Sequence, residues 1–376
     1  MVFDPMKRRL LELDGLRGIA VLMVVFGHAQ GTLPHGYSGW LSPLLLLTDA
    51  DMGVRVFFIL SGFLITSILM AEYDWSGTIC LIDFYKRRIL RIFPAFYAYL
   101  FFITGLSVTG VLPISAPLLL FAATFMLNYV CAGYILLGWG VPDGLFYAAI
   151  GHFWTLSLEE QFYWIWPLAL IFVLGKRAFV LVPALLCVIP LIRIATYFLC
   201  PGVRGQLAMM FHTGSDVILF GCLLAIYSIR YPDWFKRLIL PSWAVGLQIF
   251  LIWIVLPRIE IIVPTQSFHV IWAAINYTVD SLLLTLVIAN VLLQPEAIYT
   301  RLLRNRILVF IGTISYSLYL WQQLFCYPMH SVFNVRFPLN VLLAMGMGYL
   351  SYRFIERPFL QVKEKRYGHL PPAGGP

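Results

Sequence analysis

Charged side chains are scarce in this chain. Only 12% of its 376 residues are Asp, Glu, Lys or Arg, whereas 61% are hydrophobic. A soluble domain of this composition could not cover its apolar surface, so the sequence excludes a soluble globular protein. The formal net charge is +8. In so apolar a chain, basic residues report membrane topology, and we expect no nucleic-acid partner.

Cysteine clusters and processing signals are also missing. The six cysteines are scattered without CxxC spacing, so we expect neither a metal site nor a disulfide framework. No small-residue cleavage site follows the first apolar run, which argues against a signal peptide, and no internal repeat is detectable. We expect one transmembrane domain over residues 1–362, without an appended soluble domain, and a disordered cytoplasmic tail over 363–376.

Long apolar segments dominate what is present. They predict an all-α polytopic membrane protein with about ten transmembrane helices. The segments lie at about 12–30, 53–71, 92–109, 155–175, 178–199, 214–229, 240–257, 269–292, 307–326 and 338–355. A further piece, 112–131, is either a re-entrant or interfacial helix, or one half of a pair of crossings completed by 134–150.

Basic clusters indicate the orientation of these segments. Lys7 to Arg9 and Lys86 to Arg91 flank the first two segments, and the loop 31–52 between them has no Lys or Arg. Because cytoplasmic loops are enriched in basic residues, both termini are predicted to be cytoplasmic, provided that 110–153 makes no net crossing. Only five basic residues then fall outside: Arg55, Arg193, Arg204, Arg258 and Arg336.

The first apolar segment carries Arg17 and His28. Eleven positions are three helical turns plus about 20°, so both residues lie on one helix face, about 16 Å apart. Intramembrane titratable residues are costly and usually face a bundle interior or a watery cavity. Considered alone, Arg17 could equally be an arginine whose side chain extends to the membrane surface, and His28 could equally be a histidine at the membrane interface, neither with a catalytic role. The predicted topology puts Arg17 near the cytoplasm and His28 near the outer face.

Further candidates enter with the third and fourth segments. Arg88 and Arg91 lie three positions apart at the predicted cytoplasmic end of the third segment, a spacing that suits phosphate recognition by their guanidinium groups. Lys86 and Arg87 are better explained as topology anchors. Segment 151–168 brings Glu159 and Glu160 to the predicted depth of His28, where a carboxylate would stabilise a protonated imidazole. Because the two acids are adjacent, only one can face inward.

Other polar intramembrane residues give weaker signals. Arg193 and Asp216 are predicted to pair with each other rather than to catalyse. Asp280 lies within a segment and has no identified partner, so a functional role is the default hypothesis. The stretch 314–323 offers polar side chains that suit either a sugar-facing wall or interhelical hydrogen bonds, namely Ser315, Tyr316, Tyr319 and Gln322.

Six motifs occur in order along nearly the whole chain: LRGIAVLMVVFGH, GVRVFFILSGFLI, YKRRILRIFPAFY, FWTLSLEEQFYWIWPL, SYSLYLWQQ and YRFIERPF. In this order they resemble the acyltransferase-3 family of membrane-bound O-acyltransferases. The resemblance implies transfer of an acyl group, usually acetyl from cytoplasmic acetyl-CoA, to hydroxyls of surface or exported glycans such as exopolysaccharide or lipopolysaccharide. It also implies a multi-pass protein of a bacterial inner membrane, with lipids, acyl-CoA and a carbohydrate or glycolipid as partners.

The resemblance assigns roles residue by residue. The essential Arg/Lys-x10-His motif falls on Arg17 and His28, the arginine motif on Arg88 and Arg91, and the acid of WSLxxE on Glu159. These roles imply a donor site at the three arginines and a base, His28, oriented by Glu159; an acetyl-histidine relay is the variant. The acceptor would meet residues whose assignment is weaker: Tyr316, Tyr319, Gln322, Glu160 and Asp280.

Two departures from the family pattern accompany these assignments. Gln322 stands where many members have histidine, so the role of that position is open. The extracytoplasmic SGNH domain of some relatives is not found in this sequence. The alternative function is a glycan or small-molecule transporter, which would show inverted repeats and helices broken near the midplane; the sequence suggests neither.

Overall fold

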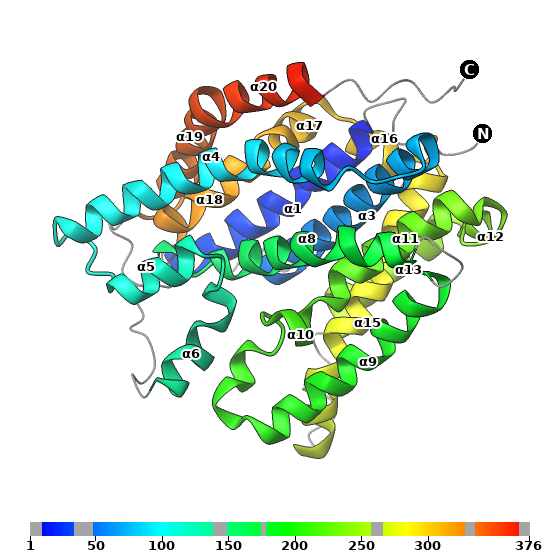
Figure 1. Ribbon diagram of the computed structural model, residues 1–376, viewed down its shortest axis with the longest axis horizontal. Coiled ribbons are helices and arrows are strands. Elements are labelled where there is room, and N and C mark those ends of the chain that lie inside the picture. The colour runs from blue at the N-terminus through cyan, green and yellow to red at the C-terminus, as the bar shows by residue number, and fades with distance from the viewer. Residues whose placement is uncertain are drawn as a thin grey trace. The chain divides into compact units, whose positions relative to one another are not determined.

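The computed structural model describes residues 10–33, 48–137, 149–173, 178–256, 266–327 and 335–367. These residues form helices and connecting turns, and no strand occurs among them. Figure 1 shows the helices and their order along the chain. The predicted all-α class is therefore confirmed for the described part of the chain. Helices are the natural form of such segments because each one satisfies its own backbone hydrogen bonds, which lipid cannot do.

Each of the ten predicted segments coincides with a helix or a helix pair. The helices are α1 Leu11–Ala29, α3 Ala50–Ser76, α4 Leu81–Val108, α8 Phe153–Val173, α9 Ala178–Leu199, α11 Asp216–Arg230, α13 Ser242–Phe250 with a π-helical continuation Leu251–Val255, α15 Gln266–Leu293, α17 Arg306–Thr313 with α18 Ser315–Cys326, and α19 Leu339–Ser351.

Four stretches among the described residues are long and apolar enough to cross a bilayer, which needs about 20 residues. They are Ala50–Ser76, Leu81–Val108, Val180–Leu199 and Ile275–Leu293. The pair α17 and α18 would be a fifth if it counts as one bent span. The membrane character is thus supported, whereas the number of ten spans and the cytoplasmic termini stay predictions.

The segment 307–326 is not one straight helix. Helices α17 and α18 meet at an angle of 76° around Ile314. The sequence analysis predicts one uninterrupted segment here and does not anticipate this break. The break coincides with a close approach of α1 to α17: a methyl group at Gly312 would overlap the carbonyl oxygen of Asp14, and one at Gly18 would overlap that of Leu308. Small residues permit this backbone contact.

The ambiguous piece 112–131 is interrupted. It contains α5 Ala116–Ala123, a 3-10 turn Leu127–Tyr129, and the start of α6 Val130–Leu136. Phe125, between them, has a positive φ of 54°. Neither helix reaches the length of a membrane crossing, which argues against a single straight span here. The stretch 134–150 extends into residues outside the described part, so the choice between the two remaining alternatives stays open.

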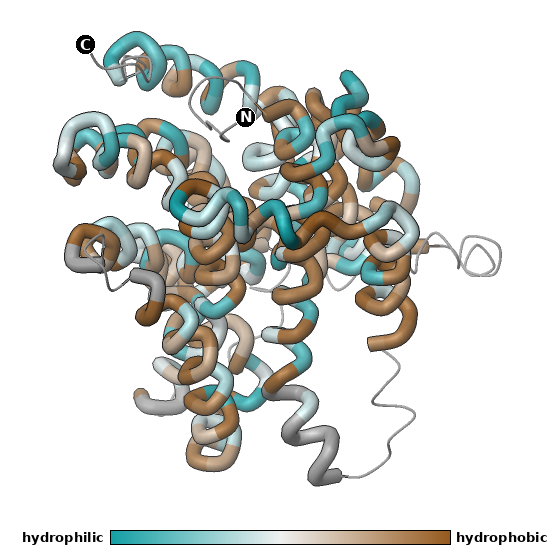
Figure 2. Tube along the Cα trace, turned by 90° about the vertical axis from the view of Figure 1, so that its right-hand side faces the viewer, coloured by the Kyte–Doolittle hydropathy of each residue, from teal (hydrophilic) through white to brown (hydrophobic). Residues whose placement is uncertain are grey.

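The last helix is longer than expected. Beyond α19, a π-helical turn Tyr352–Glu356 leads into α20 Arg357–Tyr367. Residues 363–367, which were predicted to belong to a disordered tail, are instead part of this helix, and α20 packs against α4. Residues 368–376 lie outside the described part. Figure 2 shows apolar residues along most helices and a largely polar chain near the C-terminal end.

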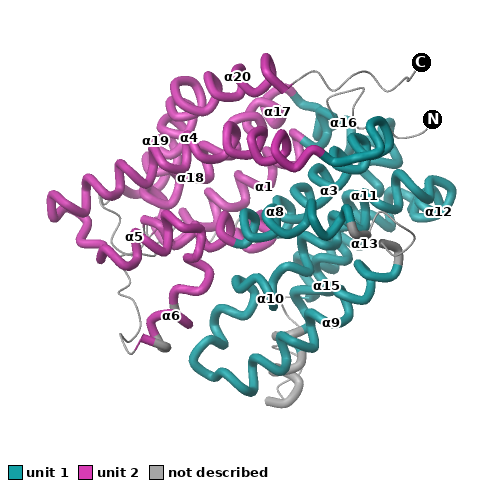
Figure 3. The backbone as a smooth tube through the Cα atoms, in the orientation of Figure 1, with its two compact units in different colours: residues 1–13, 55–79, 158–305 teal, residues 14–54, 80–157, 306–376 magenta. Residues whose placement is uncertain are grey.

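The chain divides into two compact units (Figure 3). Unit 1 comprises residues 1–13, 55–79 and 158–305, and unit 2 comprises 14–54, 80–157 and 306–376. Unit 2 holds most of the predicted site residues: Arg17, His28, Arg88, Arg91, Tyr316, Tyr319 and Gln322. Unit 1 holds Glu159, Glu160 and Asp280.

Candidate active site

His28 is held by an amide in unit 2. It lies in the last turn of α1, and its Nδ1 is 2.9 Å from Oε1 of Gln322 on α18. Because an amide oxygen only accepts hydrogen bonds, Nδ1 of His28 carries the hydrogen and donates the hydrogen bond to Oε1 of Gln322. The other ring nitrogen, Nε2, then has the free lone pair that a general base needs. This contact gives the open position Gln322 a role: it orients the imidazole.

The two tyrosines of the same helix bond to neighbouring helices. Tyr316 donates its hydroxyl to the backbone oxygen of Ile92 at 2.8 Å, and the hydroxyl of Tyr319 lies 2.6 Å from Oγ1 of Thr155. Of the two readings of stretch 314–323, these contacts support interhelical hydrogen bonding for Tyr316 and Tyr319. Gln322 differs from them because it bonds a titratable ring.

Two of the predicted donor-binding arginines share an acidic neighbour. Glu356 is buried, accepts a hydrogen bond from Ser317 Oγ at 2.7 Å, and interacts electrostatically with Arg91 and Arg17. An acidic group near both arginines offsets part of their positive charge. The sequence analysis misses Glu356, although it lies in the motif YRFIERPF.

The third arginine belongs to the same neighbourhood through Lys363 of α20. Lys363 is half-buried and interacts electrostatically with Arg91, Arg88 and Arg87 of α4. Burial, helped by these neighbouring cations, lowers the pKa of the Lys363 amine to about 8. Four cations gathered on two packed helices make the electrostatic potential here positive. The structure thus brings Arg17, Arg88 and Arg91 to one end of unit 2, and Lys363 is the member that sequence reasoning misses.

The two adjacent glutamates of α8 differ in exposure. Glu160 is buried, whereas Glu159 is half-buried, in accordance with the expectation that adjacent acids point in different directions. Both lie in unit 1 and both have interaction partners. The pairing of Glu159 with His28 stays a prediction.

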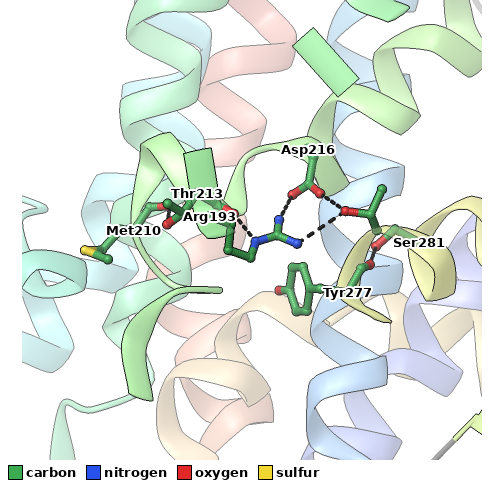
Figure 4. Close-up of polar contacts among 7 residues, drawn as sticks. Arg193, Met210, Thr213, Asp216, Tyr277 and Ser281 are labelled. Atoms are coloured by element: carbon green, nitrogen blue, oxygen red, sulfur yellow. Dashed lines mark hydrogen bonds and ion pairs between the residues drawn. The ribbon is translucent and has the colours of Figure 1, made fainter. Parts of the chain in front are cut away.

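Unit 1 contains a buried ionic network around Tyr277 (Figure 4). Arg193 donates to Asp216 Oδ1 at 2.7 Å and to the backbone oxygen of Thr213 at 2.6 Å, which confirms the predicted Arg193–Asp216 pair. The Arg193 guanidinium also lies 5.4 Å from the centre of the Tyr277 ring. These contacts satisfy both charges, and a structural role follows for the pair.

Asp280 has the partner that the sequence left unidentified. Arg55 donates to Asp280 Oδ2 at 2.6 Å, and its guanidinium lies 4.3 Å from the centre of the Tyr277 ring. The ring of Tyr277 thus lies near both buried arginines of unit 1. A role of Asp280 in substrate binding stays a prediction, and its ion pair favours a structural one.

His152 is a buried histidine that the sequence analysis overlooks. It directly precedes α8, belongs to unit 2 and interacts electrostatically with His28. Within the described residues neither of its ring nitrogens makes a hydrogen bond of good geometry, although the Leu320 backbone and the Gln323 side chain lie near the ring. The signal was present in the sequence, because His152 opens the stretch that contains Glu159. Within the described residues, no group of three or more His, Cys, Asp or Glu side chains is arranged to hold a metal ion.

Comparison with known proteins adds independent findings. The profile of a family described as an acyltransferase domain matches residues 10–351. O-acetyltransferase OatA of Staphylococcus aureus strain NCTC 8325 / PS 47 is 29% identical over 397 residues, covering 98% of this chain and 60% of that protein. OatA of strain MRSA252 is 29% identical over 393 residues, covering 97% and 59%. This chain therefore spans about 60% of the length of these relatives. No solved structure matches it.

Proposed function

We propose that this chain, which belongs to the acyltransferase domain family, is a membrane-bound O-acetyltransferase that uses cytoplasmic acetyl-CoA. The observation that carries this proposal is the pairing of two chemistries within unit 2. An oriented imidazole, His28, lies in the last turn of α1, and Arg17, in the first half of the same helix, interacts with Glu356, which also interacts with Arg91 of the cationic cluster. The names of the relatives, O-acetyltransferases, support acetyl as the group and oxygen as its acceptor.

The proposed acceptor is a hydroxyl group of a cell-surface or exported carbohydrate, such as an exopolysaccharide or a lipopolysaccharide. The proposed location is the inner membrane of a bacterial cell, with the donor on the cytoplasmic side and the glycan on the other. Glu160, Asp280, Tyr316 and Tyr319 remain weaker candidates for acceptor contacts, because each of them already interacts with other groups of the protein.

The donor is proposed to bind through its phosphates. Arg88 and Arg91 offer planar forks that match phosphate oxygens, and Lys363 adds a point charge beside them. Glu356 offsets part of the positive charge of Arg17 and Arg91 before the donor arrives. The acyl-bearing arm of the donor then extends along α1, across the roughly 16 Å that separates Arg17 from His28.

His28 is proposed as the general base. Its Nε2 removes the proton of the acceptor hydroxyl while that oxygen attacks the thioester carbon, and the protonated imidazole later returns the proton to the leaving thiolate. Glu159 is proposed to favour the protonated imidazole, as the family motif implies. In the variant mechanism, His28 attacks the thioester first and carries the acetyl group to the hydroxyl.

One observation favours a transporter as the second candidate function. The 76° break between α17 and α18 is a discontinuous helix, a feature of many secondary transporters. A transporter would move a glycan or small molecule without changing it covalently. The two functions therefore differ in whether an ester bond is formed.

The test is an acetyl-transfer assay. Purified protein in vesicles receives acetyl-CoA labelled in the acetyl group on one side and a polysaccharide with free hydroxyls on the other. We expect label on the glycan that mild alkali removes, as an ester requires, together with one free CoA thiol per acetyl group. Glycan that crosses the vesicle membrane without gaining label would overturn the proposal and favour the transporter.

Donor binding should depend on pH. Because the pKa of Lys363 is lowered to about 8, its amine is charged at pH 7 and neutral at pH 9, whereas the donor phosphates are ionised throughout this range. Affinity for acetyl-CoA should therefore fall as pH rises. A partly exposed ion pair contributes up to about 1 kcal/mol, so the loss should be about fivefold. Calorimetric titration in detergent at fixed ionic strength measures it.

Two variants make this experiment specific. Lys363→Arg keeps its charge at pH 9 and should bind with constant affinity, whereas Lys365→Arg, at an exposed position of the same helix, should retain the wild-type pH dependence.

The double variant Arg88→Ala/Arg91→Ala should bind more weakly at both pH values, most clearly at low salt. Unchanged affinity of the double variant would reduce both arginines to topology anchors.

A further inference from the structure

Both backbone groups of His152, the amide and the carbonyl, make hydrogen bonds with side chains. Its amide donates to Oε1 of Gln323 at 3.1 Å, and its carbonyl oxygen accepts hydrogen bonds from Thr155 Oγ1 at 2.9 Å and Tyr319 at 3.2 Å. Three neighbouring groups therefore hold a short stretch that precedes a helix. His152 itself is 3% exposed.

Its ring is packed but not bonded. The edges and faces of three aromatic rings surround it: the ring centres of Phe153, Tyr319 and Tyr99 lie at 4.8, 5.4 and 5.9 Å. Within the described residues neither ring nitrogen makes a hydrogen bond of good geometry, although the Leu320 backbone and the Gln323 side chain lie close enough to interact with the ring. A buried polar atom without a partner is costly, so a buried imidazole with two of them marks a place where something else binds.

This place adjoins the proposed base. His152 and His28 interact electrostatically, and consecutive residues of α18 anchor them: Gln322 bonds the ring of His28, and Gln323 bonds the backbone of His152. Among the described residues, Nε2 of Gln322 is a further buried donor without a hydrogen-bond partner. This donor and the ring of His152 thus both belong to residues that interact with His28, where the proposed reaction occurs.

The two histidines cannot share one role. Desolvation and like-charge repulsion both penalise a second imidazolium beside the first, so only one ring gains a proton at a time. His28 is suited to gain it, because Gln322 fixes its Nδ1–H and leaves Nε2 free. His152 then stays neutral, and a neutral imidazole still offers one N–H as a hydrogen-bond donor.

We propose that His152 is a second catalytic residue, whose ring N–H binds the carbonyl oxygen of the donor thioester and stabilises the oxyanion that forms there. This inference rests on the proposed acetyl transfer and adds to it the group that receives the developing negative charge. A hydrogen-bond donor that is held rigidly, is shielded from water and points at the developing charge usually makes the largest single contribution to lowering the barrier of such a reaction.

The step balances as follows. The acceptor hydroxyl gives its proton to His28 Nε2 while its oxygen bonds the thioester carbon, and the carbonyl electron pair moves to the oxygen that His152 binds. When that oxygen re-forms the carbonyl, the carbon–sulfur bond breaks. The CoA thiolate takes the proton from His28, leaving an acetyl ester, free CoA and two neutral histidines.

The test compares His152→Phe and His152→Gln with wild type in the acetyl-transfer assay. Phenylalanine keeps the aromatic packing but has no donor, so kcat should fall about 100-fold, with the KM for acetyl-CoA and the thermal unfolding midpoint unchanged. Glutamine provides an N–H again and should recover part of the loss. The matched control is His212→Phe, at an exposed histidine of α10 Phe211–Gly214, which should behave as wild type.

Several results would overturn the inference. One is a His152→Phe variant with wild-type kcat; another is a raised KM with kcat kept, which would mean that His152 binds only the ground state. Loss of the acidic limb of the pH–rate profile in His152→Gln would make His152 the base instead. If the unfolding midpoint of His152→Phe drops, the glutamine variant decides, because a purely structural role predicts no dependence on an N–H. Absence of transfer by wild type overturns the proposed function itself.

Discussion

His28→Ala should abolish acetyl transfer while the protein still reaches the membrane and unfolds at the wild-type temperature. Removing a general base costs about 10²- to 10⁴-fold in rate, and His28 is the imidazole whose Nδ1–H is held by the Gln322 amide oxygen, with Nε2 left to accept the proton. The measurement is kcat in the vesicle assay with labelled acetyl-CoA. Near-normal transfer by this variant would remove His28 from the mechanism.

Substitutions at Gln322 refine the same prediction. Gln322→Leu cannot accept the Nδ1–H of His28, so kcat should fall without a change in the KM for acetyl-CoA. Gln322→Glu restores an acceptor and adds a charge that stabilises imidazolium, so the acidic limb of the pH–rate profile should move to higher pH. A role of Gln322 in packing alone predicts no such movement, and an unchanged profile in the glutamate variant would contradict the positioning role.

Arg193→Ala should destabilise the protein by about 3–5 kcal/mol, the cost of leaving one charge of a buried pair without its partner. The side chains of Arg193 and Asp216 are 1% and 0% exposed, and the pair also binds Thr278 and the Thr213 carbonyl. We expect a much lower unfolding midpoint in detergent and little protein in the membrane.

Two comparisons identify the cause of this loss. Arg193→Leu combined with Asp216→Leu removes both charges and should be less harmful than either single change. Arg230→Ala removes an exposed partner of Asp74 and should cost no more than about 1 kcal/mol, because solvent screens that pair. If Arg193→Ala proved as mild as Arg230→Ala, the network around Tyr277 would not be a stabilising element.

Local properties of this protein follow from the sequence by itself. Apolar segments predict helices, and the helices occur there because an apolar stretch of this length has no other way to satisfy its backbone in lipid. The placement of Arg17 and His28 on one helix also depends only on spacing, and α1 is continuous from Leu11 to Ala29. The Arg193–Asp216 pair is predictable because a buried charge requires an opposite one.

Partners distant in the sequence were decided by the tertiary structure alone. His28 and Gln322 are 294 positions apart, and nothing in either segment indicates that the amide, rather than a carboxylate, bonds Nδ1. Glu356, Lys363 and His152 gain significance only where α20, α4 and α18 bring them beside other charges or rings. The break at Ile314 depends likewise on the approach of α1 to Gly312. Helical periodicity is a property of neighbouring residues, whereas a hydrogen bond between helices depends on how two distant segments pack.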